Sequence, residues 1–381
     1  MIKSAILAKK GYFSLFLYAL FLILTPFYFW RSGVPQIADF VLLLLIISYF
    51  FRKRLVIPGV SASRNFLLTG VIFVFYVVCV NFIWAVILST TELFLLRSSY
   101  YVFNLLVSVV VIGLYSDYGD EFIELTFKVT WAALIIQITS FLILGGFGGL
   151  RTRIFFNNPN QLGYFALLAA CIILFASSRI HVKLFFLITG LIFAFILIAA
   201  SQSRGAILAF FGLVLMFMVS KGRKDIKKKF YLVFFIAVLL FAILSQTTTI
   251  IQDSQLVRTV QRRIDAIGSR PTDSPIGRGY HRFTEYPEYW IFGAGEGDWS
   301  RFGGTREIHS TIVNIQVSYG IIGSFLFFLI LFFSLKNDYF INWYLVAAIL
   351  FYGLTHNGIR NSLFWILLAL MACGRNALRE H

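Results

Sequence analysis

The pair His309-Ser310 contains the residue types in this sequence that could most directly move a proton. An imidazole has an unperturbed pKa near neutrality, so a histidine can take a proton from a hydroxyl group as a general base. A lone histidine at the edge of an apolar run is usually structural, and that interpretation stays open. We expect His309 to be the base, Glu296 to be the second candidate, and Ser310 to contact the substrate.

Arginines form the second informative group, because their planar, permanently charged forks bind phosphate oxygens in pairs. Arg204 lies in Ser201-Gln-Ser203-Arg204-Gly, between two apolar runs. Ser203 could cap the following helix, whose dipole would add to the charge of Arg204. The alternative is that Arg204 is an interfacial residue whose charged end reaches toward water.

Arg151 and Arg153 precede another expected helix start. Asn158 before Pro159 predicts an N-cap with proline at the first helical position. A helix N-terminus beside two arginines is an anion site, with Asn160 as a further substrate contact. The alternative is that the motif only starts a helix.

The segment from Arg278 to Gly297 combines charge with three alternating glycines. Arg278 and Arg282 are further candidate phosphate ligands, and Gly293-Ala-Gly-Glu-Gly lets the backbone turn tightly or approach a ligand. No carboxylate pair joins a histidine at ligand spacing. We therefore expect no metal, and we also expect no cofactor and no nucleic-acid partner.

The elements that must position these residues are membrane helices. The sequence is 59% hydrophobic and 13% charged, with a mean hydropathy of +0.83, whereas soluble domains carry about 25% charged residues. Apolar runs of about 16–25 residues are long enough to cross a bilayer. We predict an all-α, polytopic transmembrane helical bundle, one integral membrane domain over residues 1–381, with spans at 12–30, 37–51, 66–88, 98–114, 126–145, 161–177, 184–200, 205–220, 230–245, 309–333, 339–355 and 361–374.

Charge predicts the orientation, because short cytoplasmic loops are rich in lysine and arginine. Twelve spans with both termini in the cytoplasm place all 12 lysines inside and 14 arginines outside. The positive-inside bias explains the absence of lysine outside but not the abundance of arginine there. The outer face therefore has the composition of a phosphate-binding surface.

Residues 246–308 are predicted to form one large outer loop between spans nine and ten. Residues 255–267 have helical spacing and could lie along the membrane surface. An aromatic cluster at residues 286–292 favours an ordered loop. Its arginines are Arg258, Arg262, Arg263, Arg270, Arg278, Arg282, Arg301 and Arg306.

Together these motifs resemble the superfamily of O-antigen polymerases and O-antigen ligases, which are membrane glycosyltransferases. The resemblance covers about residues 150–335 and rests on the order and placement of four motifs. These are Asn158-Pro-Asn-Gln-Leu-Gly, Ser201-x-Ser-Arg204-Gly, Gly293-Ala-Gly-Glu-Gly, and His309-Ser followed after nine residues by Gly320-x-x-Gly323.

The resemblance implies a GT-C-like, metal-independent, inverting transferase at the periplasmic face of the bacterial inner membrane. Its donor would be an undecaprenyl-pyrophosphate-linked glycan, held by Arg204 and Arg282 first and then by Arg278, Arg153 and Arg151. The acceptor would be the non-reducing end of another lipid-linked repeat in a polymerase, or lipid A–core in a ligase. We favour the polymerase. A chain-length regulator could be a further partner besides membrane lipids.

Two other classes remain as alternatives. A flippase for lipid-linked glycans would also be polytopic, but transporters tend to carry ionisable residues and broken helices within their spans. A non-catalytic scaffold would use the outer arginines only to bind anionic partners.

Overall fold

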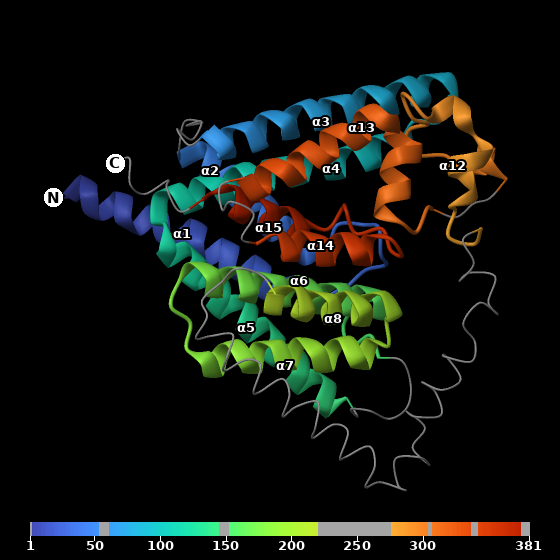
Figure 1. Ribbon diagram of the computed structural model, residues 1–381. Helices are drawn as coiled ribbons and strands as arrows, with labels where there is room; N and C mark the ends of the chain where they lie inside the picture. Colours follow the sequence, from blue (N-terminus) through green and yellow to red (C-terminus); the bar gives the residue numbers. More distant parts are fainter. Residues whose placement is uncertain are drawn as a thin grey trace, which may run out of the picture. The chain divides into compact units, whose positions relative to one another are not determined.

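The computed structural model describes residues 2–52, 61–144, 152–219, 276–303, 307–336 and 342–374. Every regular element in these ranges is helical (Figure 1). Six of the described helices are long and apolar enough to cross a membrane: Ala62–Ile87, Glu92–Tyr118, Asp120–Ile143, Pro159–Arg179, Leu184–Ser201 and Thr311–Lys336. The protein is therefore a helical membrane bundle, because helices satisfy their own backbone hydrogen bonds in lipid.

Four shorter apolar helical segments accompany the six: Tyr12–Leu24, Arg204–Val219, Trp343–Gly353 and Ser362–Ala372. The predicted span at 230–245 and the predicted surface helix at 255–267 lie outside the described residues. The total of twelve spans accordingly stays a prediction.

The helices form two compact units. The first comprises residues 1–48 and 120–269, and its core is α6, which is buried along nearly its whole length. α6 packs against α5, α7 and α8. The described helices of this unit are α1 (Ile2–Leu24), most of α2 (Ile37–Arg52), α5 (Asp120–Ile143), α6 (Pro159–Arg179), α7 (Leu184–Ser201) and α8 (Arg204–Val219).

The second unit comprises residues 49–119 and 270–381. Within it α13 packs along α3, and α15 packs against α4 and α13 (Figure 1). Its elements are α3 (Ser61–Ile87), α4 (Glu92–Tyr118), α12 (His281–Glu285), the short 3-10 turns η2 (Pro287–Tyr289) and η3 (Ser300–Phe302), α13 (Thr311–Lys336), α14 (Trp343–Gly353) and α15 (Ser362–Ala372).

α13 is broken at Gly320, whose backbone is non-helical at φ 62° and ψ −165°. The loop before α13 satisfies the groups that the break releases: Ala294 N–H donates to the Val317 carbonyl at 2.8 Å, and Gly295 N–H donates to the Ser318 carbonyl at 2.8 Å. The apolar run over 309–333 predicted a membrane span, and Thr311–Lys336 is long and apolar enough to be one. Its helix is interrupted at Gly320, where the loop backbone replaces the helical hydrogen bonds.

The predicted start of α6 is confirmed. The Asn158 side chain accepts from Gln161 N–H, the Gln161 side chain accepts from Asn158 N–H, and Pro159 is the first helical residue. The predicted cap of α8 is not formed by a side chain, because the buried Ser203 hydroxyl has no hydrogen-bond partner among the described residues. The Ser203 carbonyl instead accepts the backbone bond from Ile207.

Candidate functional site

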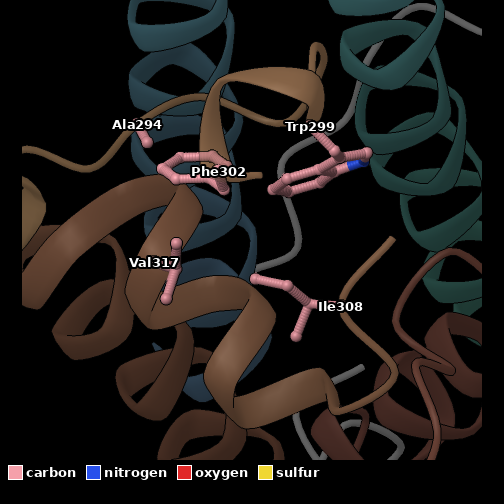
Figure 2. Close-up of a cluster of buried hydrophobic side chains, with 5 residues drawn as sticks. All are labelled: Ala294, Trp299, Phe302, Ile308 and Val317. Carbon is pink, nitrogen blue, oxygen red and sulfur yellow. The ribbon is translucent and has the colours of Figure 1, made fainter. Parts of the chain in front are cut away.

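The predicted outer loop is anchored to α13 by its own hydrophobic cluster (Figure 2). Tyr286 and Tyr289 pack against this cluster. By contrast, the side chains of Trp290, Ile291 and Phe292 are exposed, and Trp290 stacks on Phe283 at 5.3 Å between ring centres. The cluster consists of Ala294, Trp299, Phe302, Ile308 and Val317.

The alternating glycines allow the loop to contact α13 directly. A Cβ at Gly293 would overlap the Ser318 carbonyl, and a Cβ at Gly320 would overlap the Ile291 carbonyl. Gly293 also has a φ of +84°, which side chains other than glycine rarely adopt. These glycines therefore permit backbone-to-backbone packing, and two motifs of the resemblance meet here.

Glu296 lies at the centre of this packing, with a fully buried side chain. Its Oε2 accepts hydrogen bonds from the Tyr101 hydroxyl at 2.8 Å and the Tyr319 hydroxyl at 3.1 Å. Its backbone N–H donates to Asn81 Oδ1 at 2.7 Å. Glu296 thus joins the loop to α3, α4 and α13, and an acceptor sugar could not reach its carboxylate in this arrangement.

A charged cluster extends outward from Glu296. Arg360 Nε lies 3.7 Å from Glu296 Oε1, and the Arg360 guanidinium also forms an ion pair with Glu307 Oε1. Arg97 Nη2 lies 3.3 Å from Glu307 Oε2, and Asn357 Nδ2 donates to Glu307 Oε1 at 3.0 Å. Two carboxylates therefore share one arginine, while a second arginine contacts only the outer carboxylate.

The environment of Glu307 disfavours its negative charge. Burial, followed by repulsion from Glu296, raises the pKa of Glu307 from 4.5 to about 7, although Arg97 and Asn357 act in the opposite direction. This carboxyl group therefore changes its charge near neutral pH. A group with that property in a polar cluster is a candidate for a functional role.

His309 is exposed beside this cluster, at the loop end that leads into α13. Its Nδ1 lies 2.9 Å from the Glu307 carbonyl oxygen. Because a carbonyl only accepts, Nδ1 must carry the hydrogen, and in the neutral ring Nε2 is then the basic nitrogen. The exposed position and this tautomer are those that a general base needs.

Arg278 is the predicted phosphate ligand that lies next to His309. The backbone N–H of His309 donates to the Arg278 carbonyl at 3.1 Å, and Arg278 Nη1 donates to the Thr355 carbonyl at 2.9 Å. Ser310 is fully buried and its hydroxyl donates to the Gly353 carbonyl at 3.0 Å. The Ser310 hydroxyl is thus engaged within the protein.

Arg282 is buried in the loop, with 4% of its surface exposed. Its guanidinium carbon lies 5.3 Å from the ring centre of Trp299 and 5.4 Å from that of Phe302, both cation–π contacts. Burial lowers the pKa of Arg282 below its ordinary value. A phosphate could contact this guanidinium only if the aromatic packing opened.

The remaining predicted ligands belong to the first unit. Arg204 is the first residue of α8 and is half-buried, and Asn160 is the second residue of α6. Arg153 is exposed and donates to the Asn157 carbonyl at 3.3 Å. Arg151 lies outside the described residues.

Two further motifs of the resemblance meet in this unit. A Cβ at Gly163 of α6 would lie 2.8 Å from the Ser201 hydroxyl and 3.1 Å from Ser203 Cβ, at the turn between α7 and α8. Only a residue without a side chain lets α6 approach that turn so closely. The four motifs therefore form two pairs, one in each unit.

The sequence assigned no individual role to Arg97, Glu307 or Arg360. Arg97 and Arg360 were only two of the arginines expected outside, and Glu307 was only a neighbour of His309. The sequence did contain one signal for these three charged residues, because each of them lies next to a predicted span. Within the described residues, no three His, Cys, Asp or Glu side chains come together as a metal site.

Comparisons with known proteins found no match, either among protein-family models or among curated proteins.

Proposed function

We propose that this chain is a surface-polysaccharide polymerase of the O-antigen type. It transfers an undecaprenyl-pyrophosphate-linked glycan to the non-reducing end of another lipid-linked repeat. The reaction takes place at the periplasmic face of the bacterial inner membrane, in a bundle of twelve spans with both termini in the cytoplasm. It needs no metal ion and inverts the configuration of the transferred sugar.

The observation that carries the proposal is the hydrogen bond between His309 Nδ1 and the Glu307 carbonyl. It leaves Nε2 of an exposed imidazole free to accept a proton, beside a cluster of arginines. Chemistry that joins a hydroxyl group to a phosphate-activated sugar needs both features. General-base catalysis of this kind contributes about 10²–10⁴-fold to a rate.

The proposed reaction is a single displacement at the anomeric carbon of the donor. The acceptor hydroxyl oxygen attacks the anomeric carbon of the donor and forms the new glycosidic bond. The bond between that carbon and the phosphate oxygen breaks, and the pyrophosphate leaves with the electron pair. His309 Nε2 takes the hydroxyl proton.

Arginines supply the electrostatic part of the proposal. The leaving pyrophosphate gains negative charge in the transition state, and fixed guanidinium groups stabilise charge that develops there. Only the interactions that strengthen in the transition state accelerate the step. Arg278 is a predicted ligand whose backbone carbonyl accepts a hydrogen bond from His309 N–H.

The first alternative is an O-antigen ligase, which would use the same donor and base but would transfer the glycan to lipid A–core. Nothing in the described cluster selects one acceptor over the other. We favour the polymerase because the Arg278–Glu296 segment and the run Glu307-Ile-His-Ser resemble polymerases more closely.

One structural observation favours a second candidate function, the flipping of a lipid-linked glycan. α13 is interrupted at Gly320, and broken helices are common in transporters. The buried Glu296 beside the interruption adds an ionisable group to the interior of the helix bundle. A flippase would move the lipid-linked repeat between leaflets without forming a glycosidic bond.

The first test is a deletion strain whose surface glycans are separated by size on a gel. If deletion leaves lipid A–core capped with a single repeat, and the wild-type gene restores a ladder, the protein is a polymerase. Uncapped core together with long lipid-linked polymer would identify a ligase. Repeats that accumulate only on the cytoplasmic side would identify a flippase.

Arg204→Lys tests the arginine part of the proposal in the same strain. Lysine keeps the charge but cannot present two donors in one plane. We expect a shortened or missing ladder at normal protein levels. A full ladder would show that Arg204 contributes only its positive charge.

A further inference from the structure

Three donor side chains from separate parts of the second unit converge on one carboxylate. Arg97 comes from α4, whereas Asn357 and Arg360 come from the connection between α14 and α15. All three contact the Glu307 side chain, Arg97 at 3.3 Å and Asn357 at 3.0 Å. Two guanidinium groups and an amide around one anion form the kind of fork that also binds phosphate oxygens.

The donors of this fork are not all used by Glu307. Arg97 Nε is buried and has no hydrogen-bond partner among the described residues. A buried donor without an acceptor is costly, and a ligand with more oxygens than a carboxylate would remove that cost. A phosphate group offers three or more oxygens where Glu307 offers two.

Two effects oppose the negative charge of the carboxylate that occupies the fork. Glu296 shares Arg360 with Glu307 and repels it, and Glu307 is also partly desolvated. Its side chain nevertheless keeps 23% of its surface exposed, so the Glu307 side of the fork is in contact with solvent. These conditions favour exchange of Glu307 for a more highly charged anion.

We propose that Arg97, Asn357 and Arg360 form a binding site for the pyrophosphate of the lipid-linked donor, and that the Glu307 carboxylate occupies this site until the donor displaces it. The inference rests on the proposed function for the identity of the donor. It adds Arg97, Asn357 and Arg360 to the predicted pyrophosphate ligands, and it gives Glu307 the role of a competing internal anion.

The site is connected to the candidate base through one residue. The Glu307 carbonyl accepts a hydrogen bond from His309 Nδ1, while the Glu307 carboxylate occupies the anion site. Displacement of the carboxylate therefore acts on the segment that carries the imidazole. Binding of the donor and orientation of the base become parts of one event.

The test measures binding of radiolabelled inorganic pyrophosphate to the full-length protein in nonionic detergent, by equilibrium dialysis. We expect Glu307→Gln to tighten binding by about tenfold, because the competing charge is removed. We expect Arg97→Gln to weaken binding by about 10- to 100-fold, the usual loss for one hydrogen bond to a charged group. Glu288→Gln and Arg31→Gln, both at exposed positions, serve as matched controls without an effect.

A competition arm identifies the source of the anion. Undecaprenyl pyrophosphate should displace the labelled probe far more effectively than phosphatidylglycerol in nanodiscs of otherwise neutral lipid. Equal competition by phosphatidylglycerol would overturn the assignment in favour of a general headgroup site. If Glu307→Gln does not fold, Glu307→Asp should change the affinity in the same direction, because its carboxylate is withdrawn by one methylene.

Unchanged or weaker binding in a folded Glu307→Gln would overturn the inference and leave Glu307 as a structural ion-pair partner. Glycan transfer is measured separately on the same preparations. If the wild type transfers glycan but every variant binds pyrophosphate as the wild type does, the anion-site inference is rejected and the proposed function is not. The expected binding pattern without any transfer would reject the proposed function and retain the anion site.

Discussion

Arg360 Nε lies 3.7 Å from the Glu296 carboxylate, and that carboxylate is completely shielded from solvent. The pair joins the loop before α13 to the connection between α14 and α15. Tyr101 and Tyr319 donate hydrogen bonds to the same carboxylate. Glu296 is therefore the point at which the loop is fixed to the helices of its unit.

Replacing Glu296 by alanine should destabilise the protein strongly. The change removes one of the two carboxylates that contact Arg360, which keeps its ion pair with Glu307, and it deprives two tyrosine hydroxyls of their carboxylate acceptor. Each lost hydrogen bond to a charged group costs about 1.5–3 kcal/mol. Glu296→Gln keeps an acceptor of similar shape and should cost less, about 1–3 kcal/mol. Unfolding in detergent, followed by tryptophan fluorescence, measures both variants.

Glu288→Ala is the matched control, because Glu288 is an exposed glutamate in the same loop. Its free energy of unfolding should stay within about 0.5 kcal/mol of the wild type. Equal losses for Glu288→Ala and Glu296→Ala would contradict the anchoring role.

Glycines of the loop should differ in their tolerance of alanine. Gly293 and Gly303 both have positive φ, so a side chain at either position costs about 1–2 kcal/mol in backbone strain. A Cβ at Gly293 would also overlap the Ser318 carbonyl, whereas a Cβ at Gly303 would meet no described atom within 4 Å. We expect Gly293→Ala to lose about 1–3 kcal/mol more than Gly303→Ala. Comparable unfolding curves for the two variants would show that the loop can move away from α13.

His309→Ala should reduce glycan transfer by about 10²–10⁴-fold while the protein still inserts and still binds its donor. The residue is exposed, so its removal leaves no cavity. His181→Ala is the control, because His181 is also an exposed histidine but lies in the first unit. Transfer is measured with purified donor and acceptor in nanodiscs. Near-normal transfer by His309→Ala would remove His309 from the mechanism.

Glu307 should make stability depend on pH between about 4.5 and 7. The pKa of Glu307 in the folded protein is raised from 4.5 to about 7, so its stabilising contribution is complete below pH 4.5 and is lost as the pH rises to 7. Glu307→Gln does not titrate there. The melting temperature of the wild type relative to this variant should therefore fall from pH 4.5 to 7 and level off above. A difference that is independent of pH would contradict the raised pKa.

The sequence predicted the elements that depend on local signals. Asn158 and Pro159 determine the start of α6 by capping and by a fixed φ, and both act within one turn. The long apolar runs predicted membrane helices because lipid demands them. The break at Gly320 could not be predicted in this way, because the residues that stabilise it, from Trp290 to Gly295, are distant in sequence.

The candidate site was predicted in part. His309 and Arg278 were selected for their chemistry, and the structure places their backbones in contact. Glu296 was the second candidate base, and its side chain is fully buried. Its buried carboxylate accepts hydrogen bonds from hydroxyl groups on two separate helices, and no local sequence pattern shows that these groups meet. Arg360 and Glu307 gain their importance from contacts with residues that are distant in the sequence, including the ion pair between them.

The interruption of α13 also has a consequence for how the protein is made. The N–H groups of Ala294 and Gly295 that cover the open carbonyls precede α13 in the chain. The ribosome therefore synthesises the donors before the acceptors. If the loop has already been translocated when α13 enters the bilayer, the open carbonyls find their partners at once. Insertion of the interrupted helix then depends on the order of export as well as on its hydrophobicity.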